Sequence, residues 1–257
     1  MGGRSALRFA RPAVLTLAYG GDCSVELKLV ALRLGRGLDG KGYPCAVEVR
    51  EGLKQNEVQL IRDDEQRLMI RGSESDPWSL DLETSASRRR MPFPGPYGSP
   101  GLRSPFLMLF TCDEHGRRLR MVLRTLTELR RRGTRMKSAA FGALAPEVLR
   151  QGFTSDACFP RLDAVELENL LRRTAVLLEC ADESRVRTVT GALAESSGIP
   201  TVVHVEALAG QRFDSAMCVD EWSADAFASV ILETQSRTKT EARPEVLLAA
   251  IIEELRA

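Results

Sequence analysis

The chain has 257 residues, of which 44 % are hydrophobic and 28 % are charged, and its formal net charge is +1. A chain of this size and composition can bury one large core or two small ones, which excludes full disorder. It contains no run of about 18 uncharged apolar residues, so no membrane span is predicted.

The N-terminal residues are basic. Arg4, Arg8 and Arg11 precede the first acidic residue, Asp22. This composition is typical of an organellar presequence, and a short basic tail is the alternative. Six cysteines stand singly, with no two closer than 22 residues, which excludes a CxxC pair and favours buried free thiols. We therefore expect an intracellular protein in a reducing compartment, with the mitochondrion as a candidate location.

Charge is unevenly distributed along the chain. Residues 1–150 carry 26 Lys and Arg against 17 Asp and Glu, whereas the remainder carries 10 against 18. The excess is concentrated in residues 85–137, with 13 basic and 3 acidic residues. A local basic excess favours a polyanionic partner. Attraction between the two halves of the chain, or to a second subunit, is the alternative.

The first elements follow a β-α-β-α-β pattern, and consecutive units of this kind give a parallel sheet. Hydrophobic periodicity and breakers predict strands at 14–19, 45–49 and 67–71, and helices at 25–34 and 53–66. Gly35 and Gly37 are expected to end the first helix. The GxGxxG string at 35–40 follows a helix and precedes a strand, the reverse of a dinucleotide-binding loop. We therefore interpret it as a helix stop and turn.

A segment rich in Pro, Gly and Arg follows, at 85–104. It contains Arg88-Arg89-Arg90 and then a series of prolines that neither a helix nor a central strand tolerates. The α/β pattern restarts after it. Strands are predicted at 106–110, 135–141, 175–180, 199–205 and 216–219, and helices at 117–132, 165–172, 186–196, 224–232 and 245–255. A helix and a loop are expected within 143–160.

The sequence therefore predicts an α/β fold of two sequential halves with mostly parallel sheets. The first half spans 12–84, the linker 85–104, and the second half 105–257.

Acidic residues occupy three of the predicted strand-to-helix junctions: Asp22 at the first, Asp113 and Glu114 with His115 beside them at the second, and Asp182 at the third. In a parallel sheet these junctions lie at the carboxyl edge, where α/β proteins bind ligands. Carboxylates there can hold a metal or act as acid and base. Helix capping is the alternative, because Asp and Ser are ordinary N-caps. We assign no catalytic residue and expect no metal or cofactor. His204 alternates with apolar residues, as a core or sheet-face histidine does.

The predicted helix 117–132 has one apolar stripe and an opposite basic side. With the linker arginines, that side gives a candidate RNA-binding set: Arg88, Arg89, Arg90, Arg117, Arg120, Arg124 and Arg131. Guanidinium groups bind phosphate in a forked geometry, so such a row can follow a nucleic-acid backbone. Few aromatics accompany it, which favours structured RNA over stacked single strands. A solvated face, or pairing with the acidic second half, is the alternative.

Two segments resemble the anticodon-binding domain of class II aminoacyl-tRNA synthetases, the histidyl type especially. One is the strand Phe106-Leu-Met-Leu-Phe-Thr, the helix ending Leu129-Arg-Arg-Arg-Gly133, and Thr134-Arg-Met-Lys-Ser-Ala. The other is the helix and strand of Ala192-Leu-Ala-Glu-Ser-Ser-Gly-Ile-Pro-Thr-Val-Val-His204. The class II catalytic core is absent. The resemblance therefore implies an RNA-associated module without synthetase activity, and no site residue is carried over.

Three functions follow from these patterns. The first is a non-enzymatic, RNA-contacting protein with protein partners in an organellar translation or RNA-processing assembly. The second is an enzyme of the glycosyltransferase-like or nucleotide-processing type that uses the carboxyl edge of the sheet. The third is a structural subunit that docks an acidic protein.

Overall fold

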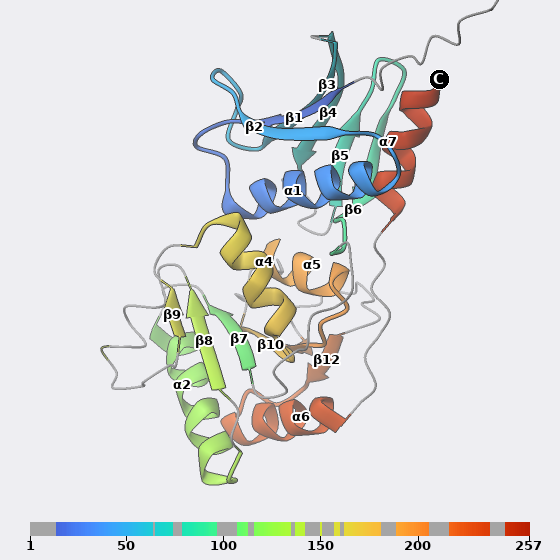
Figure 1. The fold of residues 1–257 in the computed structure, drawn as a ribbon. Helices are drawn as coiled ribbons and strands as arrows, with labels where there is room; N and C mark the ends of the chain where they lie inside the picture. The colour runs from blue at the N-terminus through green and yellow to red at the C-terminus, as the bar shows by residue number, and fades with distance from the viewer. Residues whose placement is uncertain are drawn as a thin grey trace, which may run out of the picture.

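A computed structural model defines the arrangement of the chain (Figure 1). It describes residues 14–63, 65–73, 79–96, 107–112, 116–134, 137–141, 150, 157–159, 162–180, 189–205, 216–236 and 245–257. Within these ranges, no helix is both long enough and apolar enough to cross a membrane.

The first half contains a six-stranded mixed sheet, sheet A. Its elements are β1 (Leu15–Tyr19), α1 (Val25–Gly40), β2 (Cys45–Val49), β3 (Glu57–Arg62), β4 (Glu65–Gly72), β5 (Ser79–Glu83) and β6 (Arg88–Pro92). The strand order is β2-β1-β3-β4-β5-β6. β1 and β2 are parallel, as the predicted β-α-β unit requires, whereas the other four pairings are antiparallel. The α/β class is confirmed, but this half's sheet is mostly antiparallel where a parallel one was expected.

The prediction of a helix at 53–66 is wrong, because this segment forms β3 and the turn into β4. Val58 and Leu60 face the core and are fully buried, like their pairing partners on β4. Asp63 adopts the left-handed conformation (φ 50°) in the turn. The spacing of Val58, Leu60 and Ile61 is compatible with a helix and with a bulged strand alike. Pairing with β1 and β4 favours the strand.

Helix α1 begins at Ser24, whose hydroxyl accepts a hydrogen bond from the Leu27 amide at 3.3 Å. It does not end at Gly35, as predicted, but continues to Gly40. A Cβ on Gly35 would lie 2.7 Å from Cγ2 of Val47, so this glycine permits close packing of the helix on β2. The GxGxxG string therefore lies within the helix instead of forming a turn.

The predicted linker 85–104 contains the edge strand β6, which pairs with β5. The first proline of this segment, Pro92, is the last residue of β6, and proline is tolerated at the end of an edge strand. Successive side chains of a strand point to opposite faces. Arg88 and Arg90 accordingly share one face of sheet A, while Arg89 lies on the other and pairs with Glu254 at 2.7 Å. Residues 97–104 lie outside the described ranges.

The second half contains sheet B, whose described pairings are all parallel, as predicted. Its elements are β7 (Leu107–Cys112), α2 (Gly116–Arg131), β8 (Lys137–Phe141), β9 (Ala157–Phe159), α4 (Ala164–Arg173), β10 (Val176–Cys180), α5 (Val189–Ser196), β11 (Thr201–His204), β12 (Ala216–Val219), α6 (Ala224–Ser236) and α7 (Val246–Arg256). The strand order is β12-β11-β10-β7-β8-β9. This is a doubly wound order, and the direction of strand addition reverses between β7 and β10.

Most predicted elements of the second half are found, with bounds that differ by a few residues. β9 was not foreseen. It lies in the segment 143–160 that was assigned to a helix and a loop, most of which is outside the described ranges. Helices α2 and α6 pack on one face of sheet B, and α4 and α5 on the other.

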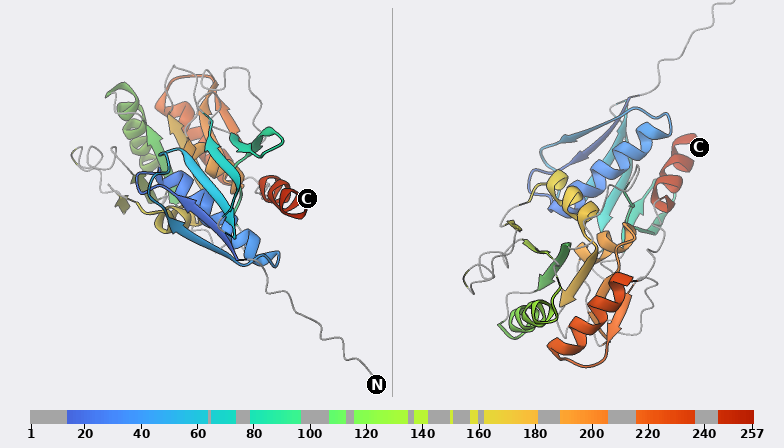
Figure 2. Two further views of the ribbon diagram at one scale, coloured as in Figure 1. Left: turned by 90° about the horizontal axis from the view of Figure 1, so that it is seen from above. Right: turned by 60° about the horizontal axis from the view of Figure 1, so that its bottom comes forward.

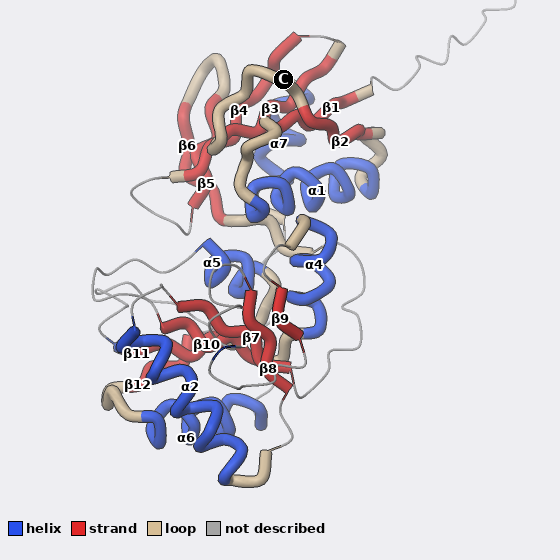
Figure 3. Tube along the Cα trace, turned by 90° about the vertical axis from the view of Figure 1, so that its left-hand side faces the viewer, coloured by secondary structure: helices blue, strands red, loops and turns tan. Residues whose placement is uncertain are grey.

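The two halves meet through helices. α1 packs against α4 and α5, so these helices lie between sheet A and sheet B, as Figure 2 and Figure 3 show. One hydrophobic core includes residues of both halves. Helix α7, the last element of the chain, contacts α1 and β6 and therefore returns to the first half. The sequence predicts this helix at the correct position but places it in the second half, whereas it packs against the first half.

Candidate functional site

A pocket of about 540 Å³ lies where the two halves meet. We call it the inter-half pocket. Its lining comes from α1 and the loop before it, from the sheet A edge that faces the second half, and from the start of α5. The lining residues are Asp22, Ser24, Leu27, Gln55, Asn56, Gly72, Ser73, Ser79, Phe93 and Val189. The lining thus combines hydroxyl, amide and carboxylate groups with the apolar side chains of Leu27, Phe93 and Val189.

Strand directions explain why these residues gather. Tyr19, at the carboxyl end of β1, pairs with Val58 near the amino end of β3, because the two strands are antiparallel. The loop before β3 therefore lies beside the junction that holds Asp22. The end of β4 joins it, since the amide of Gly72 donates to the carbonyl of Asn56 at 3.0 Å. Asp22 is thereby placed at a sheet edge that faces the other half.

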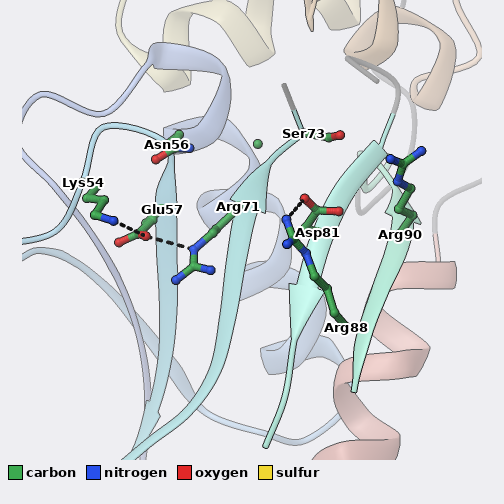
Figure 4. A pocket seen from close by; sticks show the side chains of 9 residues that line it. Lys54, Asn56, Glu57, Arg71, Ser73, Asp81, Arg88 and Arg90 are labelled. Atoms are coloured by element: carbon green, nitrogen blue, oxygen red, sulfur yellow. Dashed lines mark hydrogen bonds and ion pairs between the residues drawn. The ribbon is translucent and has the colours of Figure 1, made fainter. Parts of the chain in front are cut away.

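A second hollow, of about 880 Å³, adjoins this pocket on the face of sheet A that points away from α1 (Figure 4). We call it the outer-face hollow. The two share Asn56, Gly72 and Ser73. Its other lining residues are Lys54, Glu57, Arg71, Asp81, Arg88 and Arg90. Four cationic side chains and two carboxylates therefore line it.

Ion pairs order the charged side chains of the outer-face hollow. Arg71 donates its Nε to Glu57 at 2.9 Å and its Nη1 to Glu83. Arg88 donates its Nη2 to Asp81 at 2.5 Å, and this hydrogen bond raises the pKa of Arg88. The guanidinium groups of Arg71 and Arg88 are thus held in place by carboxylates.

The sequence identified Asp22 in the inter-half pocket, and Arg88 and Arg90, as candidate RNA-binding residues, in the outer-face hollow. The predicted ligand-edge residues Asp113, Glu114, His115 and Asp182 lie outside the described ranges. Among the described residues, no group of three or more His, Cys, Asp or Glu is arranged to hold a metal ion. His204 is buried at the end of β11, with its ring 5.1 Å from that of Trp222, in agreement with a core or sheet-face histidine.

The predicted RNA-binding arginines do not form one cluster. Arg88 and Arg90 line the outer-face hollow, whereas the arginines of α2 lie in the second half (Figure 1). Arg120 and Arg124 are exposed on α2. Arg131 pairs with Glu128 at 2.7 Å. Hydrogen bonds from Arg131 and then Arg132 lower the pKa of Glu128 to about 2. The side chain of Arg117 is outside the described part of the structure.

Sequence reasoning missed most of the site. The segment that the sequence predicts to be a helix contains Lys54, Asn56 and Glu57. No sequence motif pointed to Arg71 or Asp81. A usable signal was present in Leu80-Asp81-Leu82, where one carboxylate alternates with leucines. In an antiparallel sheet such alternation separates a core face from a charged face.

Comparison with known proteins identifies a structural similarity but no family. No protein-family model matches the chain, and no curated protein does. Among solved structures, an α,α-trehalose-phosphate synthase (UDP-forming) from Burkholderia xenovorans, in complex with glucose-6-phosphate, is similar at 14 % identity with a TM-score of 0.40. The overlap covers 70 % of this chain and 52 % of that one, so this chain spans about half the length of that structure.

Proposed function

We propose that the chain is an enzyme of the glycosyltransferase-like or nucleotide-processing type that binds a nucleotide or a related phosphorylated ligand in the inter-half pocket. The observation that carries the proposal is the position of this pocket. It lies at the carboxyl end of β1, opposite the start of α5. Small-molecule sites occur preferentially between domains and at the carboxyl ends of strands in α/β folds.

The topology of sheet B supports the same proposal. Its doubly wound order places a switch point between β7 and β10, and nucleotides bind at such points in other α/β proteins. Helix α5 follows β10 along the chain and carries Val189, which lines the pocket. A ligand in the inter-half pocket would therefore lie beside the helix that follows a switch-point strand.

The lining suits a ligand rich in hydroxyl groups. Asp22 is the carboxylate of the inter-half pocket, while Asn56 and Ser73 add amide and hydroxyl groups. A carboxylate accepts hydrogen bonds from ribose or sugar hydroxyls, and it can also remove a proton from an attacking hydroxyl. We assign Asp22 the role of hydroxyl acceptor, with that of general base as an extension.

Calorimetric titration of the full chain with the diphosphates of uridine, adenosine and guanosine, and with their sugar conjugates, tests the proposal. We expect one class to bind. Asp22→Asn and Asn56→Ala should each weaken that binding at least about tenfold, or about 1.4 kcal/mol. Asp220→Asn, at an exposed position outside the pocket, is the matched control. Failure of every nucleotide to bind at millimolar concentration, or equal losses in Asp22→Asn and the control, would contradict the proposal.

RNA contact is the second candidate, and the exposure of Arg120 and Arg124 on α2 favours it. In this case the chain would be part of an organellar translation or RNA-processing assembly. Binding to structured RNA should weaken steeply with salt, because each neutralised phosphate releases a counterion. Charge reversal of Arg117, Arg120 and Arg124 to Glu should weaken binding. The control reverses Arg36, Arg173 and Arg256, which are exposed on other helices. If the two triple variants lost the same RNA affinity, the loss would reflect net charge alone, and an RNA-binding site on α2 would be rejected.

A further inference from the structure

The outer-face hollow contains a row of alternating charges across four strands. Glu57, Arg71, Asp81 and Arg90 are paired in direct register along it. Figure 4 shows these side chains on one face of the sheet, with Lys54 and Arg88 beside them. Cross-strand pairs of opposite charge stabilise a sheet, and a purely structural role is the simplest explanation of the row.

The burial of the charges indicates more than a structural role. The two acids that line the hollow lie deep, with Glu57 6 % and Asp81 7 % exposed. The cations reach outward, since the side chain of Arg88 is 61 % exposed and that of Lys54 is 77 % exposed. Glu57 and Asp81 therefore hold Arg71 and Arg88 from below, whereas Glu83, which also pairs with Arg71, is 43 % exposed. Because the four cations outnumber these three acids, a ligand meets a net positive surface.

Unused hydrogen-bond donors remain on two of the cations, Arg71 and Arg88. Arg71 uses Nε and Nη1 on carboxylates, and Arg88 uses only Nη2 on Asp81. In the described part of the chain, no hydrogen bond involves Nη2 of Arg71 or Nη1 of Arg88. A guanidinium that carboxylates orient, and that keeps unused N–H groups, suits a contact with phosphate.

We propose that the outer-face hollow binds the phosphate groups of a small phosphorylated ligand through Arg71, Arg88, Arg90 and Lys54. The hollow shares Asn56, Gly72 and Ser73 with the inter-half pocket, so one ligand can extend from one into the other. The inference rests on the proposed function for the identity of the ligand. The phosphate site itself can be tested alone.

The probe for this test is inorganic pyrophosphate, titrated into the full chain at low ionic strength. Arg88→Gln with Arg90→Gln should weaken pyrophosphate binding at least about tenfold, since two charge-assisted contacts are lost. Lys54→Gln, at an exposed position before β3, should weaken it less. Arg89→Gln is the matched control, because it removes the same charge from the same strand on the opposite face of sheet A. Circular dichroism checks that each variant folds.

Several outcomes would overturn the inference. They are absence of pyrophosphate binding by the wild-type chain, binding that the Arg88/Arg90 variant leaves unchanged, and equal losses in that variant and in Arg89→Gln. Binding of structured RNA without binding of pyrophosphate would overturn it as well, in favour of an RNA surface.

The proposed function and this inference can fail separately. If nucleotides bind and depend on Asp22 but pyrophosphate does not bind, only the phosphate site is rejected. If pyrophosphate binds and depends on Arg88 and Arg90 while no nucleotide binds, the phosphate site stands and the proposed function fails.

Discussion

Arg33 on α1 and Glu168 on α4 form an ion pair of 2.8 Å that links the two halves, with side chains only 1 % and 2 % exposed. Arg33 also donates to the carbonyl of Pro94 at 2.7 Å and to the hydroxyl of Ser197 at 2.8 Å. Glu168 accepts a further hydrogen bond from Arg172 at 2.9 Å. A buried charge is tolerated only when it is paired and hydrogen-bonded. This pair therefore depends on the correct packing of α1 against α4 and α5.

Removal of one charge of the Arg33–Glu168 pair should destabilise the folded chain. We expect Glu168→Gln to lower the free energy of unfolding by about 3 kcal/mol, because it leaves the buried Arg33 without its counter-charge. Lys41→Gln is the control, since Lys41 pairs with Glu245 at the surface, and a loss below about 1 kcal/mol is expected there. Urea denaturation followed by circular dichroism measures both. A loss in Glu168→Gln no larger than in the control would contradict a structural role for the buried pair.

The same pair predicts an acid dependence of stability. Burial alone would raise the pKa of Glu168, but attraction to Arg33 and hydrogen bonds from Arg172 and Arg33 outweigh it and lower the pKa below its ordinary value of 4.5. The unfolded chain then binds more protons than the folded chain at acid pH. The stabilisation is complete above about pH 4.5 and is lost as the pH falls through the folded pKa. Stability measured between pH 3 and 7 should fall less steeply at the acid end in Glu168→Gln than in the wild type.

Gly191 on α5 should resist substitution. An added Cβ would lie 2.5 Å from Oε2 of the buried Glu179, which is closer than side chains approach each other. We expect Gly191→Ala to cost about 1–3 kcal/mol, because the carboxylate or the helix must move. Gly40→Ala is the matched control, since nothing lies within 4 Å of its Cβ position, and a change within about 0.5 kcal/mol is expected. Thermal unfolding of the two variants tests this, and similar melting temperatures would argue against the close contact.

Cys45 should be a slow nucleophile. Burial first, and the nearby carboxylate of Asp39 second, raise its pKa to about 11, so little thiolate forms at pH 8. Alkylation of Cys45 by iodoacetamide should be at least about 100-fold slower in the folded chain than in urea. Cys218 is exposed and provides the internal comparison. Peptide mapping by mass spectrometry separates the sites, and similar folded and unfolded rates at Cys45 would contradict the prediction.

Local patterns were sufficient to predict much of the second half. The apolar stripe of α2, from Leu119 to Leu129, is buried as its spacing requires. Short apolar runs such as Val176–Cys180 form parallel strands between helices, as the α/β alternation indicates. These predictions succeed because a helix stripe or a fully buried strand depends on residues within a few positions of each other. Asp22 at a strand-to-helix junction was recognised for the same reason.

Only the tertiary structure decided the conformation of the Val58 segment and the residues that meet in the outer-face hollow. The Val58 segment satisfies a helical and an extended pattern equally, and hydrogen bonds to distant strands make it β3. Glu57, Arg71, Asp81 and Arg90 are far apart in sequence and become neighbours through antiparallel pairing. Arg89 is separated from Arg88 and Arg90 because a strand places alternate side chains on opposite faces. The outer-face hollow therefore depends on which strands pair and in what register. Strand pairing and register are determined by burial of the whole core, which no short stretch of sequence encodes.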